Sequence, residues 1–529
     1  MSSENKLDYR SLSSPGKKGG TNSHEQSSLK PPGSTKPQTH TTEDSQEPAH
    51  AQSLTNPYTT QNQEFPSERN PGNSFAETSG QTEIFVSESR PDVVPEADLG
   101  YAEQVKRRKA EKIADRDRKL INDENWLRRN GHTLSYIGLY MFSILVLFRP
   151  YELIPGLGFL SATAFYFAIG TLAVFIPTQF AAEGNITSFP TEVKAVLVMA
   201  GIALITIPIA KDPGMAWEAF NEPFVKAVLM FVVMVNVIRT RRRLVGMMWL
   251  SLSIGVVLSY LALGMYMRGE MTVEGYRVGE VIGGMFENPN EMSMHLIMML
   301  PLAVALGLAT KSKAAKIIYF ATAIILVSAN FITFSRGGFL GLIGSMAVLA
   351  WKLGRKNRLN VTIVGVIATV LALILAPGNF GIRVLSIFIP GLDSVGSSDQ
   401  RRELLERSII VTLRNPWGIG IGNFPIVGIH NLVSHNAYTQ VSSELGLLGL
   451  AAYLIFMVSP FRKLSAIERT LFSEDDHNWF YYVSVGLQAS IVAYLISSFF
   501  ASVAYNWFIY YLIAYAVAFR RVYRLEAGI

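Results

Sequence analysis

Residues 244–266 read LVGMMWLSLSIGVVLSYLALGMY, a run without a single Asp, Glu, Lys or Arg. A helix crosses the bilayer core with about 20 predominantly apolar residues, so this run predicts a membrane-spanning helix. Further apolar runs lie on both sides of it, and the shorter ones are compatible with tilt or local thinning of the bilayer. The predicted spans are 134–148, 157–180, 195–210, 224–238, 244–266, 292–310, 316–334, 338–351, 361–376, 447–461, 479–500 and 504–519. The sequence therefore predicts an all-α polytopic membrane protein with about 12 transmembrane helices.

The composition favours this fold class over two or three soluble domains. Hydrophobic residues make up 49% of the 529 residues and charged residues only 17%, although a long polar N-terminus is included in both values. The chain has no cysteine, which excludes disulfides and thiolate chemistry. The net charge of +6 is distributed along the chain and not gathered in one patch, so it does not indicate nucleic-acid binding.

The N-terminal region differs from the rest of the chain. Residues 1–100 are rich in Ser, Thr, Pro, Gln, Asn and Glu, which predicts a disordered tail because such a segment buries too little apolar surface. The tail contains no apolar core of a signal peptide. Residues 101–132 include EQVKRRKAEKIADRDRKL, for which we expect a basic juxtamembrane helix that signals topology. Attraction of this helix to anionic cytoplasmic lipid is the alternative interpretation.

Basic residues concentrate in alternate loops, which predicts that both termini are cytoplasmic. With the N-terminus inside, residues 133–376 form the first nine spans and residues 447–529 the last three with the C-terminus. The inner loops then carry clusters such as 241–243 and 311–316. The short outer loops carry only Arg149, Lys211, Lys226, Arg268, Arg277 and Arg336.

Residues 377–446 remain as one large external loop. Loops of this length are usually functional or disordered. RRELLERSIIVTLRNP has helical periodicity, and WGIGIGNFP and SHNAYTQVSSELG follow it, so we expect an ordered external subdomain. Of the 8 histidines, His430 and His435 lie in this loop. A general base working near neutral pH on this side would be one of these two, whereas a solvated or structural histidine is the alternative.

Arginine prevails over lysine on the predicted external side. A guanidinium binds phosphate through a planar, permanently charged fork, so this side predicts an anionic ligand such as a lipid pyrophosphate. The alternative is that the loop arginines are merely solvated and that Arg336 anchors the end of a span. His295 lies inside a predicted span, where a polar residue suggests function. The external arginines are Arg149, Arg268, Arg277, Arg336, Arg383, Arg401, Arg402, Arg407 and Arg414.

Four segments occur in order over about residues 275–465: MFENPNEMSMHLIMMLPLA, FSRGGFLGL, RNPWGIGIGNF and SHNAYTQVSSELGLLGLAAYLIF. Together they resemble the O-antigen ligase superfamily, which also contains O-antigen and exopolysaccharide polymerases and protein O-oligosaccharyltransferases. The last segment is the most specific of the four. The long N-terminal tail is not part of the family pattern.

The resemblance implies a GT-C-like membrane fold and a metal-independent glycosyltransferase without a cofactor. Its donor would be a glycan on undecaprenyl pyrophosphate. His435 is implied to deprotonate the acceptor hydroxyl, and Arg336 and Arg277 to hold the pyrophosphate. An arginine that opens the loop helix in relatives falls on Arg401 or Arg402. The residues expected to support the site are Asn436, Tyr438, Glu444 and Asn290.

The expected partners are the lipid-linked donor, a glycan or lipid acceptor and the membrane, without nucleic acid. The tail is a candidate docking segment for polysaccharide-assembly proteins. The expected location is the bacterial inner membrane. Polymerisation is slightly favoured over ligation, because nothing in the sequence looks specific for a lipid A core.

Two other function classes compete with a glycan transferase. Many spans with polar residues near the midplane also fit a polytopic solute transporter, although no internal repeat is visible. A scaffold recruited through its tail is the third class. SEDDHN, with Glu474, Asp475, Asp476 and His477, resembles a metal cluster. We interpret it as a solvated cytoplasmic loop and expect no metal site.

Overall fold

The computed structural model describes residues 126–529 except 155, 162, 284–285, 356–357, 377, 379, 387–388, 390–396, 475–477 and 529, together with residues 108, 111 and 112. The predicted disordered tail and most of the predicted juxtamembrane helix lie outside the described residues. Residues 126–132 are helical, and they begin the first long helix, α2 (Trp126–Leu147).

The described residues confirm an all-α polytopic membrane protein. Eight helical segments among them are long and apolar enough to cross a membrane. They contain the helices α4 (Thr163–Glu183), α5 (Thr191–Thr206), α7 (Val225–Val237), α8 (Arg241–Met267), α9 (Pro289–Ala309), α10 (Lys313–Ile332), α17 (Gly446–Ser473) and α18 (Trp479–Ser497). The four remaining predicted spans coincide with α2, α11 (Arg336–Leu353), α12 (Arg358–Leu375) and α19 (Trp507–Ala527). These four have shorter apolar stretches or charged residues at an end.

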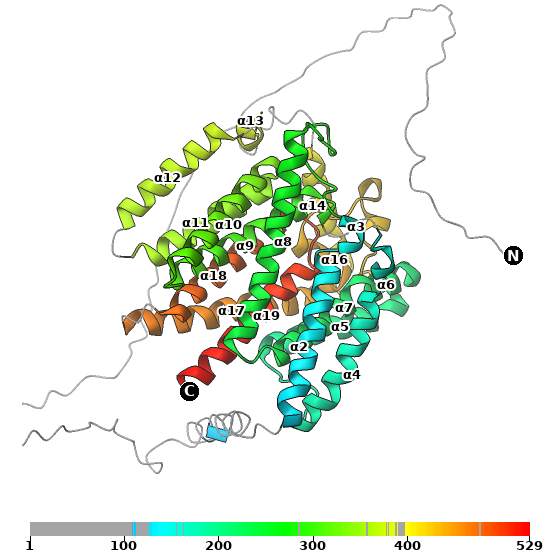
Figure 1. Ribbon diagram of the computed structural model, residues 1–529. Coiled ribbons are helices and arrows are strands. Elements are labelled where there is room, and N and C mark those ends of the chain that lie inside the picture. The colour runs from blue at the N-terminus through cyan, green and yellow to red at the C-terminus, as the bar shows by residue number, and fades with distance from the viewer. Residues whose placement is uncertain are drawn as a thin grey trace, which may run out of the picture. The chain divides into compact units, whose positions relative to one another are not determined.

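Helices α9 and α18 form the centre of the bundle. Helix α18 packs against α9, α11 and α17, and α10 packs on α8 and α9 (Figure 1). The side chains of α9 are buried on nearly every side, which explains why this helix lacks a polar face. Helices α2 and α4 pair with each other, and α12 contacts α11 at the margin of the bundle.

Small residues allow the central helices to approach closely. A Cβ atom added at Gly486 of α18 would lie 2.5 Å from the Cβ of Ala305 and 3.0 Å from the carbonyl oxygen of Pro301, both on α9. Ser490 of α18 donates a hydrogen bond to the carbonyl oxygen of Met298 at 2.6 Å. Glycine and serine at helix contacts are a common means of packing helices inside membranes, where the hydrophobic effect does not drive association.

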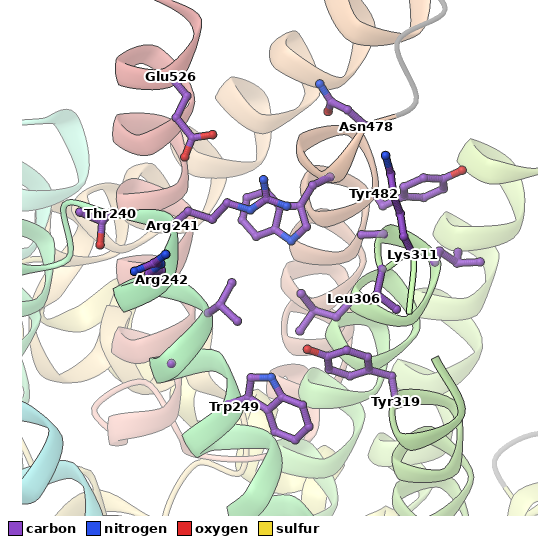
Figure 2. Close-up of a pocket in the computed structure, with 16 residues that line it drawn as sticks. Thr240, Arg241, Arg242, Trp249, Leu306, Lys311, Tyr319, Asn478, Tyr482 and Glu526 are labelled. Carbon is purple, nitrogen blue, oxygen red and sulfur yellow. The ribbon is translucent and has the colours of Figure 1, made fainter. Parts of the chain in front are cut away.

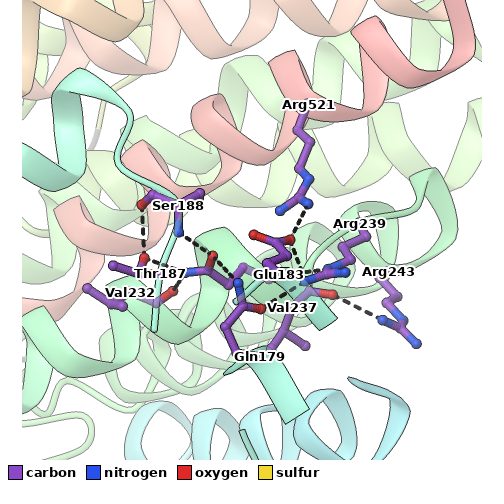
Figure 3. Close-up of polar contacts among 10 residues, drawn as sticks. Gln179, Glu183, Thr187, Ser188, Val232, Val237, Arg239, Arg243 and Arg521 are labelled. Carbon is purple, nitrogen blue, oxygen red and sulfur yellow. Dashed lines mark hydrogen bonds and ion pairs between the residues drawn. The ribbon is translucent and has the colours of Figure 1, made fainter. Parts of the chain in front are cut away.

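One end of the bundle is joined by buried ion pairs. Glu183 at the end of α4 accepts from Arg239 at 2.8 Å and from Arg521 of α19 at 2.9 Å (Figure 3). Gln179, one helical turn earlier, accepts from the same Arg239 guanidinium at 2.8 Å. Arg239 and Arg521 belong to the basic residues from which the sequence predicts a cytoplasmic side, so they have a structural role in addition to any topological one.

Two further glutamates have the same role at this end. Glu192 is fully buried at the start of α5 and forms a two-bond contact with Arg520, at 3.0 and 2.9 Å. Glu468 of α17 pairs with Lys352 and Arg355, each at 2.7 Å. We call this the glutamate end. Helix α11 runs from Arg336 to the Lys352 region, about 25 Å at 1.5 Å per residue, so Arg336 lies at the other end of the bundle.

The predicted external loop is largely helical where it is described. It contains α13 (Phe380–Leu385), α14 (Ser397–Arg414), α15 (Phe424–Val427) and α16 (Ala437–Glu444). The helix predicted from RRELLERSIIVTLRNP is confirmed as α14. Leu404, Val411, Ile419 and Phe424 form a small apolar core of their own. The loop is therefore packed as a subdomain on the bundle.

Candidate functional site

The Gly-rich segment WGIGIGNF, residues 417–424, follows α14 within the loop and is hydrogen-bonded to the end of α16. Its backbone amides at Ile419 and Gly420 donate to the carbonyl oxygens of Ser443 and Glu444, both at 3.0 Å. Gly418 has a φ of +91°, and a Cβ atom there would lie 2.3 Å from the carbonyl oxygen of Glu444. Glycine is required at this position for both reasons. The segment thereby fixes the end of α16, the helix that begins after His435.

The side chain of Glu444 contacts the same Gly-rich segment. Its carboxyl group is buried, accepts hydrogen bonds from the backbone amides of Gly422 and Phe424, and lies beside the phenol of Tyr505. Burial raises the pKa of Glu444 to about 7. The geometry makes Glu444 a positioning residue, which holds the Gly-rich segment against α16.

Asn436 and Tyr438 hold the start of α16. The Asn436 side chain caps the helix by accepting from the amides of Tyr438 and Thr439, at 2.9 and 3.1 Å. The Tyr438 hydroxyl donates to the carbonyl oxygen of Leu495 in α18 at 2.7 Å. These contacts join the loop subdomain to the centre of the bundle.

His435 directly precedes this cap in a left-handed backbone conformation, with a φ of +50°. Such a conformation is uncommon for a residue other than glycine and is a feature of constrained sites. Burial and the neighbouring Arg401 guanidinium lower the pKa of His435 to about 4. The imidazole is therefore neutral near pH 7 and able to accept a proton. His430 is exposed in a short turn, so the two loop histidines occupy different environments.

Arg336 is a buried side chain at the first position of α11. Ser335 caps the helix by accepting from the amide of Gly338 at 3.2 Å, and Arg336 donates through Nη1 to the hydroxyl of Ser386 at 3.0 Å. Its side chain is only 8% exposed, so it does not extend into bulk water or lipid as a surface arginine would. A guanidinium held in this way is preorganised for an anionic group.

The two glycines of SRGG allow α11 to enter the bundle. A Cβ atom at Gly337 would lie 2.9 Å from the Cβ of Phe500, and one at Gly338 would lie 1.7 Å from Oγ of Ser293. Larger residues would displace α11 and with it Arg336. This motif thus sets the depth at which the arginine lies.

Arg277 is held by three partners. Nε donates to the carbonyl oxygen of Thr333 at 2.9 Å, Nη2 donates to Oδ1 of Asn290 at 2.8 Å, and Nη1 lies 3.5 Å from the carboxylate of Glu274. Burial lowers the pKa of Arg277, and repulsion from the nearby Arg336 acts in the same direction. Asn290 therefore positions Arg277, which gives the Asn-Pro-Asn element a physical role.

The structure separates the two arginines that open the loop helix. Burial lowers the pKa of Arg401 to about 10, and repulsion from the nearby guanidinium groups of Arg336 and Arg277 acts in the same direction. In the described part of the chain, no hydrogen bond or ion pair joins Arg401 to another side chain. Arg402 points away from this group, with its side chain 79% exposed and paired with Glu406 at 3.1 Å.

Two residues that the sequence reasoning did not place in the site also lie in this cluster. Arg383 of α13 donates to the carbonyl oxygen of Phe334 at 3.0 Å and lies near Arg401. Glu274 contacts Arg383 at 3.4 Å as well as Arg277. Arg383 was visible as one of the external arginines, whereas no sequence signal distinguished Glu274.

The sequence also singled out His295, as a polar residue inside a span, and the SEDDHN segment. His295 is buried in α9 with its ring 5.2 Å from that of Phe286, and Nε2 lies 3.4 Å from the carbonyl oxygen of Ser251. It packs between helices and does not join the arginine cluster. In the SEDDHN segment, Asp475, Asp476 and His477 lie outside the described residues.

The fold and this cluster define a multi-pass membrane protein with a buried, arginine-rich site at one end of its bundle. The model of the protein family described as O-antigen ligase matches residues 321–454 of the chain. The matched segment contains Arg336, Arg401 and His435. No curated protein matches the chain. The family match confirms the resemblance to the O-antigen ligase and polymerase superfamily, and it supports a glycan-processing function in the membrane.

Proposed function

We propose that this protein is a glycosyltransferase that moves or polymerises a glycan from undecaprenyl pyrophosphate onto an acceptor hydroxyl. One observation carries the proposal: His435, neutral near pH 7, lies beside Arg401 within a cluster that also contains Arg336 and Arg277. A base next to several guanidinium groups matches a reaction in which a hydroxyl displaces a pyrophosphate.

The proposed reaction balances without a covalent enzyme intermediate. The acceptor oxygen forms a bond to the anomeric carbon of the donor while the bond from that carbon to the pyrophosphate oxygen breaks. His435 takes the hydroxyl proton and later releases it to water. Arg401, Arg336 and Arg277 stabilise the negative charge that develops on the leaving pyrophosphate. Because the leaving group is already good, positioning and charge neutralisation are the main requirements.

An apolar groove beside the cluster supports a polyprenyl donor. The groove has a volume of about 590 Å³ and lies between α11, α18 and Tyr438 of α16. Leu340 in its wall follows Arg336 by one helical turn, so a pyrophosphate at Arg336 would have its prenyl chain beside the groove. The side chains that line it are Leu340, Ile343, Tyr438, Leu495, Ile496, Phe499 and Phe500, with Gly344.

We place the site on the external face of the bacterial inner membrane, with both termini in the cytoplasm. The support is the excess of basic residues at the glutamate end, the end remote from His435. Reporter fusions after Lys313 and Lys356 should give a cytoplasmic signal, and a fusion at Ser434 an external one. A cytoplasmic signal at Ser434 would contradict this orientation.

The decisive experiment uses purified protein in detergent with a lipid-linked oligosaccharide and an acceptor glycan. Wild-type protein should release polyprenyl pyrophosphate without a sealed compartment, and EDTA should leave the rate unchanged. His435→Ala should lower turnover by roughly 10²–10⁴-fold, the usual effect of losing a general base. His430→Ala is the matched control and should stay near the wild-type rate.

Two outcomes would redirect the proposal. Equal and small losses in the two histidine variants would mean that the acceptor is activated elsewhere. Solute uptake into sealed vesicles without any glycan transfer in detergent would favour the transporter class. Supplying repeat units or a lipid A core as alternative acceptors separates polymerisation, which we favour, from ligation.

A further inference from the structure

A second pocket opens at the glutamate end of the bundle, about the length of a span away from His435. It has a volume of about 1350 Å³ and lies between the ends of α8, α9, α10, α18 and α19 (Figure 2). Neither the arginine cluster nor the apolar groove of the proposed transfer site contributes to its walls. The pocket is therefore separate from the proposed transfer site.

Charged side chains surround the mouth of this pocket. Arg241 and Arg242 begin α8, Lys311 precedes α10, and Glu526 lies near the end of α19. Three cations against one carboxylate make the mouth positive, so it favours an anionic group. The Arg241 guanidinium lies 4.2 Å from the ring centre of Trp479, which holds it at the rim.

The inner part of the pocket is apolar and aromatic. Trp249 and Tyr319 lie together on one side, with ring centres 5.0 Å apart, and Leu306 is beside them (Figure 2). Trp249 follows Arg241 by eight residues on α8, about 12 Å further along the helix at 1.5 Å per residue. The lining thus changes from cationic at the mouth to apolar about two helical turns into the membrane-spanning segment.

We propose that this pocket binds an anionic phospholipid of the leaflet at the glutamate end. The anionic head group lies at the mouth lined by Arg241, Arg242 and Lys311, and an acyl chain lies along Trp249 and Tyr319. Basic pockets between transmembrane helices are suited to acidic lipid head groups, because the cations sit at head-group depth. A soluble phosphate compound would use the cations but would leave the aromatic inner wall unoccupied.

Binding has a structural consequence for the bundle. The pocket walls come from five helices, and two of them, α9 and α18, form the packed centre. A lipid in the pocket contacts these helices at once, so it stabilises the folded state according to its concentration and affinity. This inference does not depend on the proposed transferase activity, and its test needs no glycan substrate.

The test measures lipid binding to the delipidated full-length protein in detergent. Dioleoylphosphatidylglycerol is titrated, bound lipid is counted by native mass spectrometry, and dioleoylphosphatidylcholine serves as the uncharged-head-group comparison. The test variant is the double substitution Arg242→Gln with Lys311→Gln. The matched control is Arg462→Gln with Lys313→Gln, because these basic residues are exposed at the same end but do not line the pocket.

Removing two cations should weaken phosphatidylglycerol binding about thirtyfold, since each Lys or Arg near an anionic lipid surface contributes roughly a factor of five. The control variant should bind like the wild type, and phosphatidylcholine should bind weakly to every variant. An equal loss in both double variants would reveal a general charge effect and overturn the assignment. Unchanged binding in the test variant, or equal binding of the two lipids, would also overturn it. Displacement of the lipid by millimolar inorganic phosphate would assign the pocket to a soluble phosphate compound instead.

Discussion

Replacing Arg336 by lysine tests whether this residue binds a pyrophosphate or only supports the end of α11. Lysine keeps the positive charge and can reach a similar depth, but it loses the planar fork of the guanidinium. In the structure, Arg336 is buried beside Ser386 at 3.0 Å, and its side chain lies near Arg277 and Arg401. The two possible roles of Arg336 predict different magnitudes.

If Arg336 had only a structural role, the substitution would cost roughly 1 kcal/mol of stability for each hydrogen bond that lysine cannot replace, such as the one to Ser386. Turnover of the folded protein would change little. If Arg336 stabilises the leaving pyrophosphate, its loss resembles removal of one preorganised donor from a transition state, about 10²–10³ in kcat. We therefore expect Arg336→Lys to fold and insert normally, with turnover at about a hundredth of the wild-type value or less.

The assay is turnover of a lipid-linked oligosaccharide at matched amounts of folded protein, together with thermal unfolding of each variant. Arg336→Ala should be as inactive as Arg336→Lys. Arg407→Lys is the control, because Arg407 is exposed on α14 and donates to the carbonyl oxygen of Val427, a bond that lysine can replace. Full activity of Arg336→Lys would refute the pyrophosphate contact and return Arg336 to a purely structural role.

Further predictions concern His435, Arg401 and Gly338. Because the pKa of His435 in the folded protein is lowered to about 4, transfer should persist below the ordinary histidine pKa of about 6.5. The rate should fall only as the pH drops through about 4. An inflection of the pH–rate profile near the ordinary value of about 6.5 would contradict this. Arg401→Gln should lower the rate and raise the pH at which activity falls, but only part of the way from about 4 to 6.5. Burial remains, and it is the larger cause of the lowered pKa of His435. Gly338→Ala should cost about 1–3 kcal/mol, the usual range for overpacking, measured by chemical unfolding. Its Cβ would lie 1.7 Å from Oγ of Ser293, which must turn away and give up its hydrogen bond to Asn330. Gly365→Ala, with open space around it, is the matched control, and equal stability of the two variants would be the contrary result.

The choice between Arg401 and Arg402 could have been predicted in part from the helical periodicity of the sequence. The buried residues of α14 include Leu404, Ser408 and Val411, which share one helical stripe with Arg401. Arg402 belongs to the exposed stripe with Glu406. The periodicity of α14 therefore separates Arg401 from Arg402, once the apolar stripe is known to face α16. The packing of α14 on α16 supplies that knowledge.

The ion pairs of the basic residues at the glutamate end could not be predicted from the sequence. Arg239, Arg520 and Arg521 contribute to the charge bias that predicts orientation, and no sequence pattern distinguished them from solvated loop residues. The structure pairs Arg520 with Glu192 and Arg521 with Glu183, which lie 328 and 338 residues earlier in the chain. It pairs Arg239 with Glu183, which lies 56 residues earlier. Such pairs depend on which helices become neighbours, which hydropathy does not specify.

The sequence by itself determined the membrane class of the fold, the positions of the spans and the motif segments that match the O-antigen ligase family. These properties are local, because hydropathy over about 20 residues decides whether a helix crosses a bilayer. Only the tertiary structure decided that Arg277, Arg336, Arg401 and His435 meet in one cluster, with Arg383 beside them. Their convergence depends on the close packing permitted at Gly338 and on the docking of the Gly-rich segment against α16. Contacts between distant segments arise when the helices pack, and a single sequence contains no local signal for them.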